Sequence, residues 1–429
     1  MQSASIIALG HADKSCLCLF RVIITTLLLA ERRVITQTPF TQNERRSVFG
    51  LASLYSVRMI GLFMVLPILV VYGQDLPDAS PALLGLALGI YGLTQALLQI
   101  PLGALSDRIG RKPVILGGLL VFAAGSVLAA YASSVWWLVL GRALQGAGAI
   151  AGAVMALLAD STRSEQRTKA MAIVGMSIGA SFAVALMLGP VLAAWGGLRL
   201  VFLVTAGLAI LGVLITVWRI PAAPVLADVI DESDTRVWYK NADLWRLNAG
   251  VFVLHFTLTA AFMVVPLLLL NDLSLSKELH WKIYAPVLVA SVIGLGLLMR
   301  LSERAGYPKI AFGLAVLCLS AALWAFESQL GHTYTGVIGA LWCFFVGFNF
   351  LEASLPSLLS KRVTQQRRGA AMGSFSTSQF AGAFLGGSGG GLMLQNTSAA
   401  ILLLLCAALL VVWFLWLIQS PTLLDNALK

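Results

Sequence analysis

The chain has 429 residues, of which 59% are hydrophobic and only 11% are charged, and its formal net charge is +10. Soluble globular proteins are closer to half apolar and a quarter charged, so this composition excludes that class and predicts an integral membrane protein. The basic residues fall in short segments between apolar runs, a pattern that orients a chain in a bilayer, so the positive charge does not indicate a nucleic acid partner.

We interpret residues 1–47 as an N-terminal extension. The apolar run at residues 16–30 is interrupted by Arg21 and is shorter than the roughly 20 residues of a comfortable span. One alternative is the apolar part of a signal peptide, although the charge before it is weak and no small-residue cleavage site is clear. A peripheral extension, or a start assigned too early, is favoured because a thirteenth span would reverse the topology of all that follows.

From Val48 onwards, apolar runs of membrane-spanning length recur at near-regular spacing. Their lengths fit a hydrocarbon core of roughly 30 Å at about 1.5 Å per helical residue, and their continuity excludes the alternating pattern of a barrel. We predict spans at about 48–72, 81–105, 114–132, 135–159, 169–194, 198–218, 245–270, 283–301, 309–329, 334–359, 370–394 and 398–419. The predicted fold class is an all-α membrane protein with twelve transmembrane helices in two sets of six.

The longest polar interruption divides these spans into two halves. It covers residues 219–244 and contains two prolines and an acidic cluster, so we interpret it as a linker. The predicted domains are an N-terminal six-helix bundle at 48–218 and a C-terminal six-helix bundle with a short tail at 245–429. Basic residues concentrate in the loops on the linker's side of the membrane, which by the positive-inside rule makes the linker and both termini cytoplasmic.

The two halves repeat each other in sequence. Residues 63–67 recur as 262–266 at an offset of 199, residues 105–110 recur as 301–306 at an offset of 196, and residues 166–171 align with 367–372 at an offset of 201. Parallel repeats of this kind are typical of transporters that carry their substrate between two halves and work by rocking one against the other.

Three motifs resemble the major facilitator superfamily. Residues 103–112, GALSDRIGRK, match the G-x-L-x-D-R-x-G-R-K signature loop between the second and third helices at every specified position. Residues 140–146 resemble the arginine motif of the fourth helix, and Gly189 with Pro190 resembles the core of the fifth-helix motif of proton-coupled exporters. The resemblance extends from Arg58 to about Gly390, and we expect no soluble C-terminal domain of the kind that some members carry.

The charged segment between the second and third spans is predicted to be a tight loop and a conformational gate. Asp107 and Arg111 are four residues apart, and Asp160 ends the fourth span on the same side. The resemblance implies that these charges hold the outward-open state closed on the cytoplasmic side, with Gly103 allowing close approach to the eleventh helix. The alternative is solvated, orienting charge. The predicted gate residues are Gly103, Asp107, Arg108, Gly110, Arg111, Lys112 and Asp160.

Three titratable residues inside spans are candidates for proton coupling. Glu352 is the only carboxylate well inside the second half's predicted helices, His255 lies about ten residues into the seventh span, and Arg142 lies within the fourth. Embedded ionisable groups mark ion pathways by default, and the resemblance associates Arg142 with proton coupling. The alternatives are a helix contact locked by Glu352, a histidine bonded to a neighbouring helix, and structural pairing of the arginine.

Polar residues at helical spacing are candidates for the walls of a substrate cavity. Tyr91, Gln95 and Gln99 recur at i, i+4 and i+8 on one face of the second helix. Such stripes also bond helix to helix, and that alternative stays open. The predicted cavity residues are Arg58, Tyr91, Gln95, Gln99, Asn349 and Gln379.

Gly189 and Pro190 are predicted to form a bend point, because proline inside a helix removes a hydrogen bond. No nucleophile with a base, no phosphate-binding loop and no metal spacing appears, so we expect neither an enzyme nor a cofactor nor a metal. The cysteines behave as small hydrophobes.

These observations predict a proton-coupled secondary transporter of the bacterial inner membrane that exports small amphiphilic molecules or drugs by alternating access. The alternatives are uptake by proton symport and a membrane sensor that transports nothing. The expected partners are a small-molecule substrate, protons and membrane lipid, and we expect a monomer.

Overall fold

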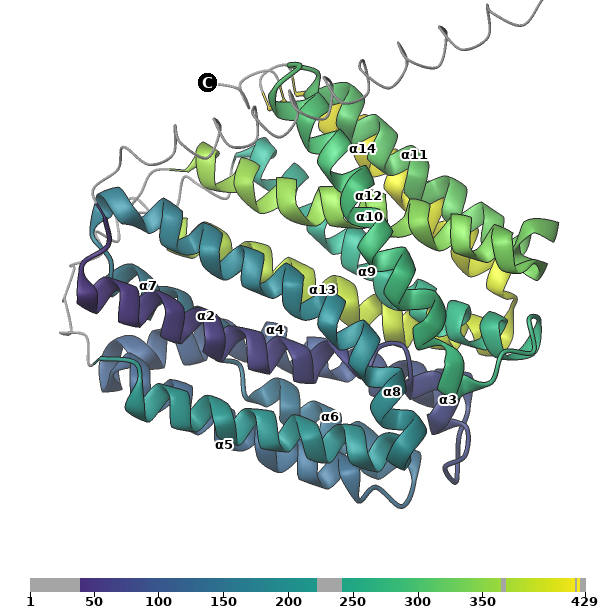
Figure 1. Ribbon diagram of the computed structural model, residues 1–429, viewed down its shortest axis with the longest axis horizontal. Coiled ribbons are helices and arrows are strands. Elements are labelled where there is room, and N and C mark those ends of the chain that lie inside the picture. The colour runs from purple at the N-terminus through teal and green to yellow at the C-terminus, as the bar shows by residue number, and fades with distance from the viewer. Residues whose placement is uncertain (1–38, 222–240, 364–367, 421–422, 425–429) are drawn as a thin grey trace, which may run out of the picture. The chain divides into compact units, whose positions relative to one another are not determined.

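The computed structural model describes residues 39–221, 241–363, 368–420 and 423–424, and their secondary structure is entirely helical (Figure 1). Residues 46–429 form one compact unit, and Met1–Arg45 form a separate one. The predicted extension and linker fall mostly on residues outside the described ranges.

The first half contains seven helices that correspond to the first six predicted spans. They are α2 (Gln42–Phe63), α3 (Leu69–Gly73), α4 (Pro81–Ile109), α5 (Arg111–Ala130), α6 (Val135–Ala147), α7 (Ala151–Asp160) and α8 (Ser164–Trp218). The second half contains α9 (Ala242–Asn271), α10 (Trp281–Glu303), α11 (Pro308–Glu327), α12 (Tyr334–Arg362), α13 (Arg368–Asn396) and α14 (Ala399–Ile418), with short 3₁₀ turns η4 (Lys277–Leu279) and η5 (Gln329–His332).

Nine helical segments of the described chain are long and apolar enough to cross a membrane. One of them covers both the fifth and sixth predicted spans, because these two spans form the single element α8. The remaining two predicted spans are present as α2 with α3 and as α13, which is rich in glycine and serine. The predicted twelve-span, all-helical class is therefore confirmed.

Several helices begin at the residue types that satisfy exposed backbone donors. Ser80 accepts a hydrogen bond from the amide of Leu83, and Pro81 follows it at the first helical position, where its missing N–H has no cost. Thr333 caps α12 and Ser398 caps α14 in the same way. The sequence thus sets the starts of these spans locally.

Two predicted spans are interrupted. The first is broken at residues 64–68, between α2 and α3, and the fourth is broken at residues 148–150, between α6 and α7. In the first break, a Cβ on Gly189 of α8 would collide with the backbone of Met64, so only glycine allows this approach. In α8 the departure from helical geometry lies at Gly196 and Gly197, where the chain turns from the fifth span to the sixth.

The prediction of a loop at residues 103–113 is wrong. Helix α4 continues to Ile109 and α5 begins at Arg111, so Gly110 alone separates them. Gly110 has φ of +96°, a backbone conformation that side chains disfavour. Charged residues suggested a loop because they cannot enter lipid, but a helix longer than the bilayer carries them beyond it.

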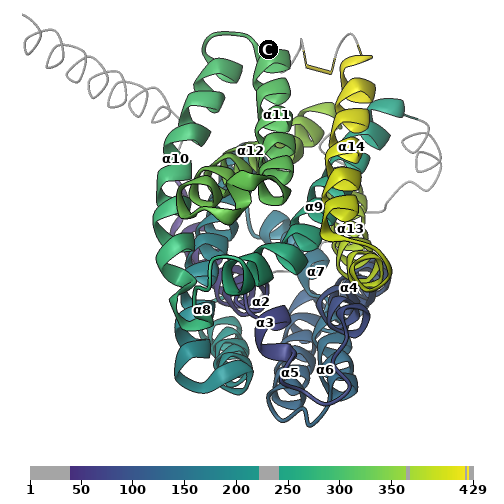
Figure 2. The same cartoon turned by 90° about the vertical axis from the view of Figure 1, so that its right-hand side faces the viewer.

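The two halves lie against each other along α4 and α13. Figures 1 and 2 both show α13 between α9 of its own half and α4 of the first half. A Cβ on Gly89 would lie 2.6 Å from the carbonyl oxygen of Phe384, and one on Gly92 would lie 2.5 Å from that of Phe380. The absence of side chains at these glycines therefore sets how closely the halves approach.

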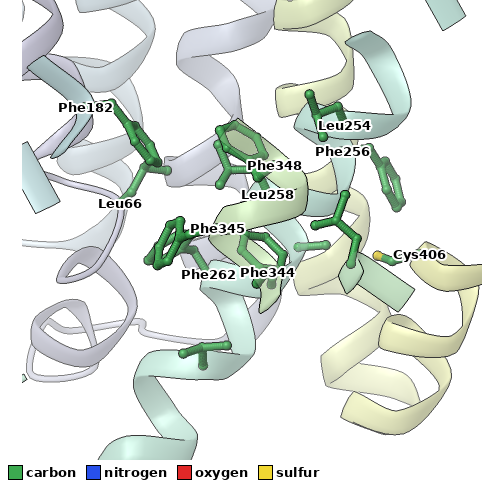
Figure 3. Close-up of a cluster of buried hydrophobic side chains, with 14 of the residues drawn as sticks. Leu66, Phe182, Leu254, Phe256, Leu258, Phe262, Phe344, Phe345, Phe348 and Cys406 are labelled. Carbon is green, nitrogen blue, oxygen red and sulfur yellow. The ribbon is translucent and has the colours of Figure 1, made fainter. Parts of the chain in front are cut away.

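Aromatic side chains complete the contact between the halves. Phe182 of α8 stacks on Phe348 of α12 with ring centroids 5.6 Å apart, and its ring also lies 4.9 Å from that of Phe63 (Figure 3). Phe182 and Phe348 belong to the buried hydrophobic core, and Phe63 packs against it.

Candidate functional site

Three of the predicted residues meet inside the second half. His255 of α9, Gln379 of α13 and Glu352 of α12 come from three different helices. The Nε2 atom of His255 lies 2.7 Å from Nε2 of Gln379 and 3.8 Å from Oε2 of Glu352. Gln379 also donates to Oε1 of Glu352 over 3.4 Å. We call these three residues the proton-site cluster.

The hydrogen bonds of this cluster define the state of the imidazole. Nδ1 of His255 lies 3.1 Å from the carbonyl oxygen of Val251, which can only accept, so Nδ1 carries the hydrogen. Nε2 is then the acceptor for the amide of Gln379. The histidine side chain is only 6% exposed, whereas that of Glu352 is 33% exposed. The carboxylate of Glu352 is therefore less enclosed than the imidazole of His255.

The proton-site cluster adjoins two of the aromatic contacts between the halves. The ring of His255 lies 5.8 Å from that of Phe348, the residue on which Phe182 stacks. Gln379 is followed by Phe380, whose ring lies 6.1 Å from that of Tyr91 in α4. A rearrangement in the cluster would therefore act directly on residues that join the two halves.

Asn349 does not join this cluster. Although it lies one turn before Glu352, its amide donates to Ser291 of α10 over 3.2 Å.

In the first half, Arg58 organises the predicted polar stripe. Its Nη2 donates to the hydroxyl of Tyr91 over 2.9 Å and to Oε1 of Gln95 over 2.8 Å, and Gln95 donates in turn to Gln99 over 3.3 Å. Arg58 is 1% exposed, and Gln95 and Gln99 are buried as well. In this conformation these residues form a buried network and do not lie on an open wall.

Arg142 is embedded beside that network. It is 2% exposed, donates to the carbonyl oxygen of Ala87 over 3.2 Å and to Oε1 of Gln145 over 2.8 Å, and lies over the ring of Tyr91. Gln145 is held by Ser126. Tyr91 thus contacts both buried arginines.

The predicted charge cluster assembles at the junction of α4, α5 and α7. Arg111 pairs with Asp107 and donates to Asp160 over 3.1 Å and to Ser106 over 2.8 Å. We call Asp107, Arg111 and Asp160 the charge cluster. Of the other predicted gate residues, Arg108 is exposed and Lys112 is half-buried.

The close approach predicted at Gly103 occurs elsewhere on α4 in this conformation. A Cβ on Gly103 would meet nothing within 4 Å, whereas Cβ atoms on Gly85, Gly89 and Gly92 would collide with α13. The halves are therefore closest near the start of α4, at the end opposite the charge cluster.

Sequence reasoning missed a contact that joins the halves at that end. Lys277, just after α9, pairs with Asp75 over 3.0 Å and lies 4.4 Å from the ring centroid of Tyr72. Lys277 looked like an ordinary loop charge in the sequence, because no local pattern relates residues 202 positions apart. No sequence pattern indicated the contacts of Phe182 with Phe348 or of Ser106 with Arg111 either.

The helical repeats, the closely packed halves and the embedded polar groups define a membrane transporter, and comparison assigns its family. The sequence model of the Major Facilitator Superfamily matches residues 51–387. The chain belongs to this superfamily of transporters and is a multi-pass membrane protein.

Among individual relatives, the chain is 45% identical to the inner membrane transport protein YajR of Escherichia coli strain K12, over 81% of this chain and 77% of that protein. It is 27% identical to the multidrug resistance protein MdtH of Aeromonas hydrophila, over 73% of this chain and 79% of that protein. The structure resembles that of the human organic anion transporter MFSD10, with a TM-score of 0.67 and 18% identity over 89% of this chain and all of that one, which supports the fold.

Proposed function

We propose that the protein is a proton-coupled secondary transporter of the bacterial inner membrane that exports small amphiphilic molecules by alternating access. The observation that carries the proposal is the proton-site cluster, in which a carboxylate and an imidazole face each other across an amide within the spans. Carboxylates and imidazoles can bind and release protons. Placing such groups within a membrane is energetically unfavourable, so their presence there indicates a functional role. Similarity to the inner membrane transport protein YajR supports the location, and similarity to the multidrug resistance protein MdtH supports export.

The geometry suggests how a proton would change the structure. With neutral His255, the amide of Gln379 bridges Nε2 and Glu352. A proton on Nε2 removes the acceptor that Gln379 uses and turns Nε2 into a donor towards Glu352, 3.8 Å away. Gln379 must then reorient. Because it adjoins Phe380, which contacts Tyr91, the change reaches the α4–α13 contact.

The described conformation would be the inward-facing one. The halves meet closely near the start of α4, and the charge cluster lies at the opposite end, which the positive-inside rule assigns to the cytoplasm. In the outward-facing conformation, the charge cluster would then lie on the closed side, as the family signature implies.

Proton movement in proteoliposomes tests this function. The purified protein is reconstituted with a pH-sensitive dye inside the vesicles, and a panel of amphiphilic compounds is added without an imposed gradient. An exporter moves protons against the flow of the compound, so compound entering the vesicles drives protons out. Movement in the same direction would indicate symport. No movement with any compound would contradict transport and favour a sensor.

A further inference from the structure

We propose that the substrate is a small organic anion, whose negative group is attracted by Arg58 and Arg142 of the first half. The proposal rests on the transport function above and adds the chemical class of the substrate. Its test distinguishes failure of one from failure of the other.

The charges embedded in the spans do not balance. Arg58 and Arg142 are both buried and permanently charged, and within the described residues neither forms an ion pair with a carboxylate. Their partners are a phenol, two amide oxygens and two carbonyl oxygens. Glu352 is the carboxylate of the proton-site cluster and lies in the other half. Two positive charges against one negative charge leave this interior positive.

Arg58 also has hydrogen-bonding capacity that the protein leaves unused. Among the described residues, its Nη2 is the bonded nitrogen, and the buried Nε and Nη1 atoms have no acceptor there. A buried donor without a partner is costly, and more so on a charged group. A guanidinium with two unbonded nitrogens can donate two parallel hydrogen bonds to a carboxylate, sulfonate or phosphate, which then binds in a bidentate manner.

A polar ladder leads from Arg58 to the less crowded end of α4. Gln95 bonds both Arg58 and Gln99, and Gln99 lies beside Gly103 and Gly152. A Cβ on Gly103 would meet no atom within 4 Å. An anion that enters at this end would pass the amides of Gln99 and Gln95 before it reaches the arginines.

A cationic substrate does not fit this arrangement. It would be repelled by the arginine pair in a medium of low dielectric, where charges act over long distances. Glu352 is the embedded carboxylate in the described spans that could attract it, but that carboxylate already accepts from Gln379 and faces His255. A neutral substrate could offer an oxygen to the free donors of Arg58, but it would leave the positive charge of the arginine pair uncompensated.

The test compares ligands that share one apolar body and differ in charge. 1-Naphthoate, 1-naphthalenesulfonate, 1-naphthamide and 1-naphthylmethylammonium are titrated against the purified full chain, and affinity is measured by calorimetry and by the rise in Tm. We expect the two anions to bind at least about tenfold more tightly than the amide and the cation, as desolvated charge pairs do. Equal affinities, tighter binding of the cation, or no binding would overturn the proposal.

Variants assign the effect to Arg58. Arg58→Gln should lose the tenfold preference for anions and Arg58→Lys should keep part of it, while Arg199→Gln, which removes an arginine that lies over Tyr131, should keep all of it. Unchanged selectivity in folded Arg58→Gln would overturn the assignment. If that variant does not fold, the wild-type ligand series decides alone.

Proton movement separates the two proposals. If the ammonium probe drives proton movement and the anions do not, transport stands and the anionic substrate is wrong. If the anions bind selectively but no probe moves protons, the anion site stands and coupled transport is wrong.

Discussion

His255, Gln379 and Glu352 come from three helices and are joined by the two hydrogens of a single amide. At the scale of individual residues, each of the three side chains has a different environment, so single substitutions can test their roles one at a time. The histidine is enclosed and the carboxylate is partly exposed. The proposed role of the amide is to transmit a change in the protonation of the histidine to the next residue along α13.

Glu352→Gln should abolish proton-coupled transport while leaving the fold intact, because glutamine keeps the size and the acceptor but cannot ionise. We expect at least about a hundredfold loss of proton movement, in the range typical of removing a proton-transfer group. Proteoliposome flux measures it. Glu327→Gln, at the exposed end of α11, is the matched control and should transport normally. Wild-type coupling in Glu352→Gln would remove the carboxylate from the mechanism.

Arg142→Ala should insert normally and yet fail to transport. The arginine costs about 2.5–3.5 kcal/mol on the insertion scale at a helix centre, so its loss does not hinder insertion. It does remove the donor to Gln145 and the contact with Tyr91 that links the first half to Phe380. Expression and size-exclusion profiles check folding, and flux checks transport. An unfolded variant would show that the arginine is structural.

At the scale of elements, two contacts at opposite ends of α4 are expected to work against each other. The charge cluster ties α4, α5 and α7 together at one end. Glycines bring α4 against α13 at the other. Substitutions at the two ends should therefore shift the conformational equilibrium in opposite directions.

Asp107→Asn should shift the resting population towards the inward-open state. It removes one of the two carboxylates that orient Arg111, and with it the arrangement expected to secure the cytoplasmic side. Labelling of single cysteines from each side of the membrane measures the shift. Asp78→Asn, at the exposed turn before α4, serves as the control. The same labelling pattern in Asp107→Asn and wild type would reduce the segment to an orienting charge.

Gly89→Val should have the opposite effect. Its Cβ would meet the carbonyl oxygen of Phe384 at 2.6 Å, so the helices cannot approach as they do here. Overpacking of this kind costs about 1–3 kcal/mol, which corresponds to a shift of roughly fivefold to more than a hundredfold. Gly117→Val, on open α5 surface, is the control. Labelling that still shows the inward-facing pattern would contradict the proposed role of the α4–α13 contact.

At the scale of the whole molecule, transport requires the two halves to separate where they now touch. Asp75 and Lys277 belong to different halves and pair near the closed end. The pair is partly exposed and by itself contributes only about 0.2–1 kcal/mol. The pair is useful as a marker, because the distance between Asp75 and Lys277 is expected to change during each transport cycle.

A disulfide between Asp75→Cys and Lys277→Cys, in a chain whose native cysteines are replaced by alanine, should stop transport when oxidised and release it on reduction. A covalent link across the contact prevents the halves from rocking apart. Flux is measured before and after dithiothreitol, and each single cysteine variant controls for the substitutions. Full transport by the cross-linked protein would contradict movement at this contact.

The sequence alone determined the number of spans, their helical class and the identity of the embedded polar residues, and it predicts the division into two halves. These follow from hydropathy and from short motifs, which are local properties that lipid enforces along the chain. The triad of Asp107, Arg111 and Asp160 was also foreseeable, because the spacing of the first two and the length of the fourth span place all three on one side.

Only the tertiary structure decided which residues meet. Asn349 shares a helix face with Glu352 but bonds to Ser291, whereas His255 and Gln379 join Glu352 from helices far apart in sequence. The close approach of Gly189 at the break between α2 and α3 and the pairing of Lys277 with Asp75 likewise depend on contacts at long sequence separation. Periodicity shows which face of a helix is polar, but packing of the whole bundle decides what that face touches. It therefore decides where the proposed proton site and the unbonded donors of Arg58 lie.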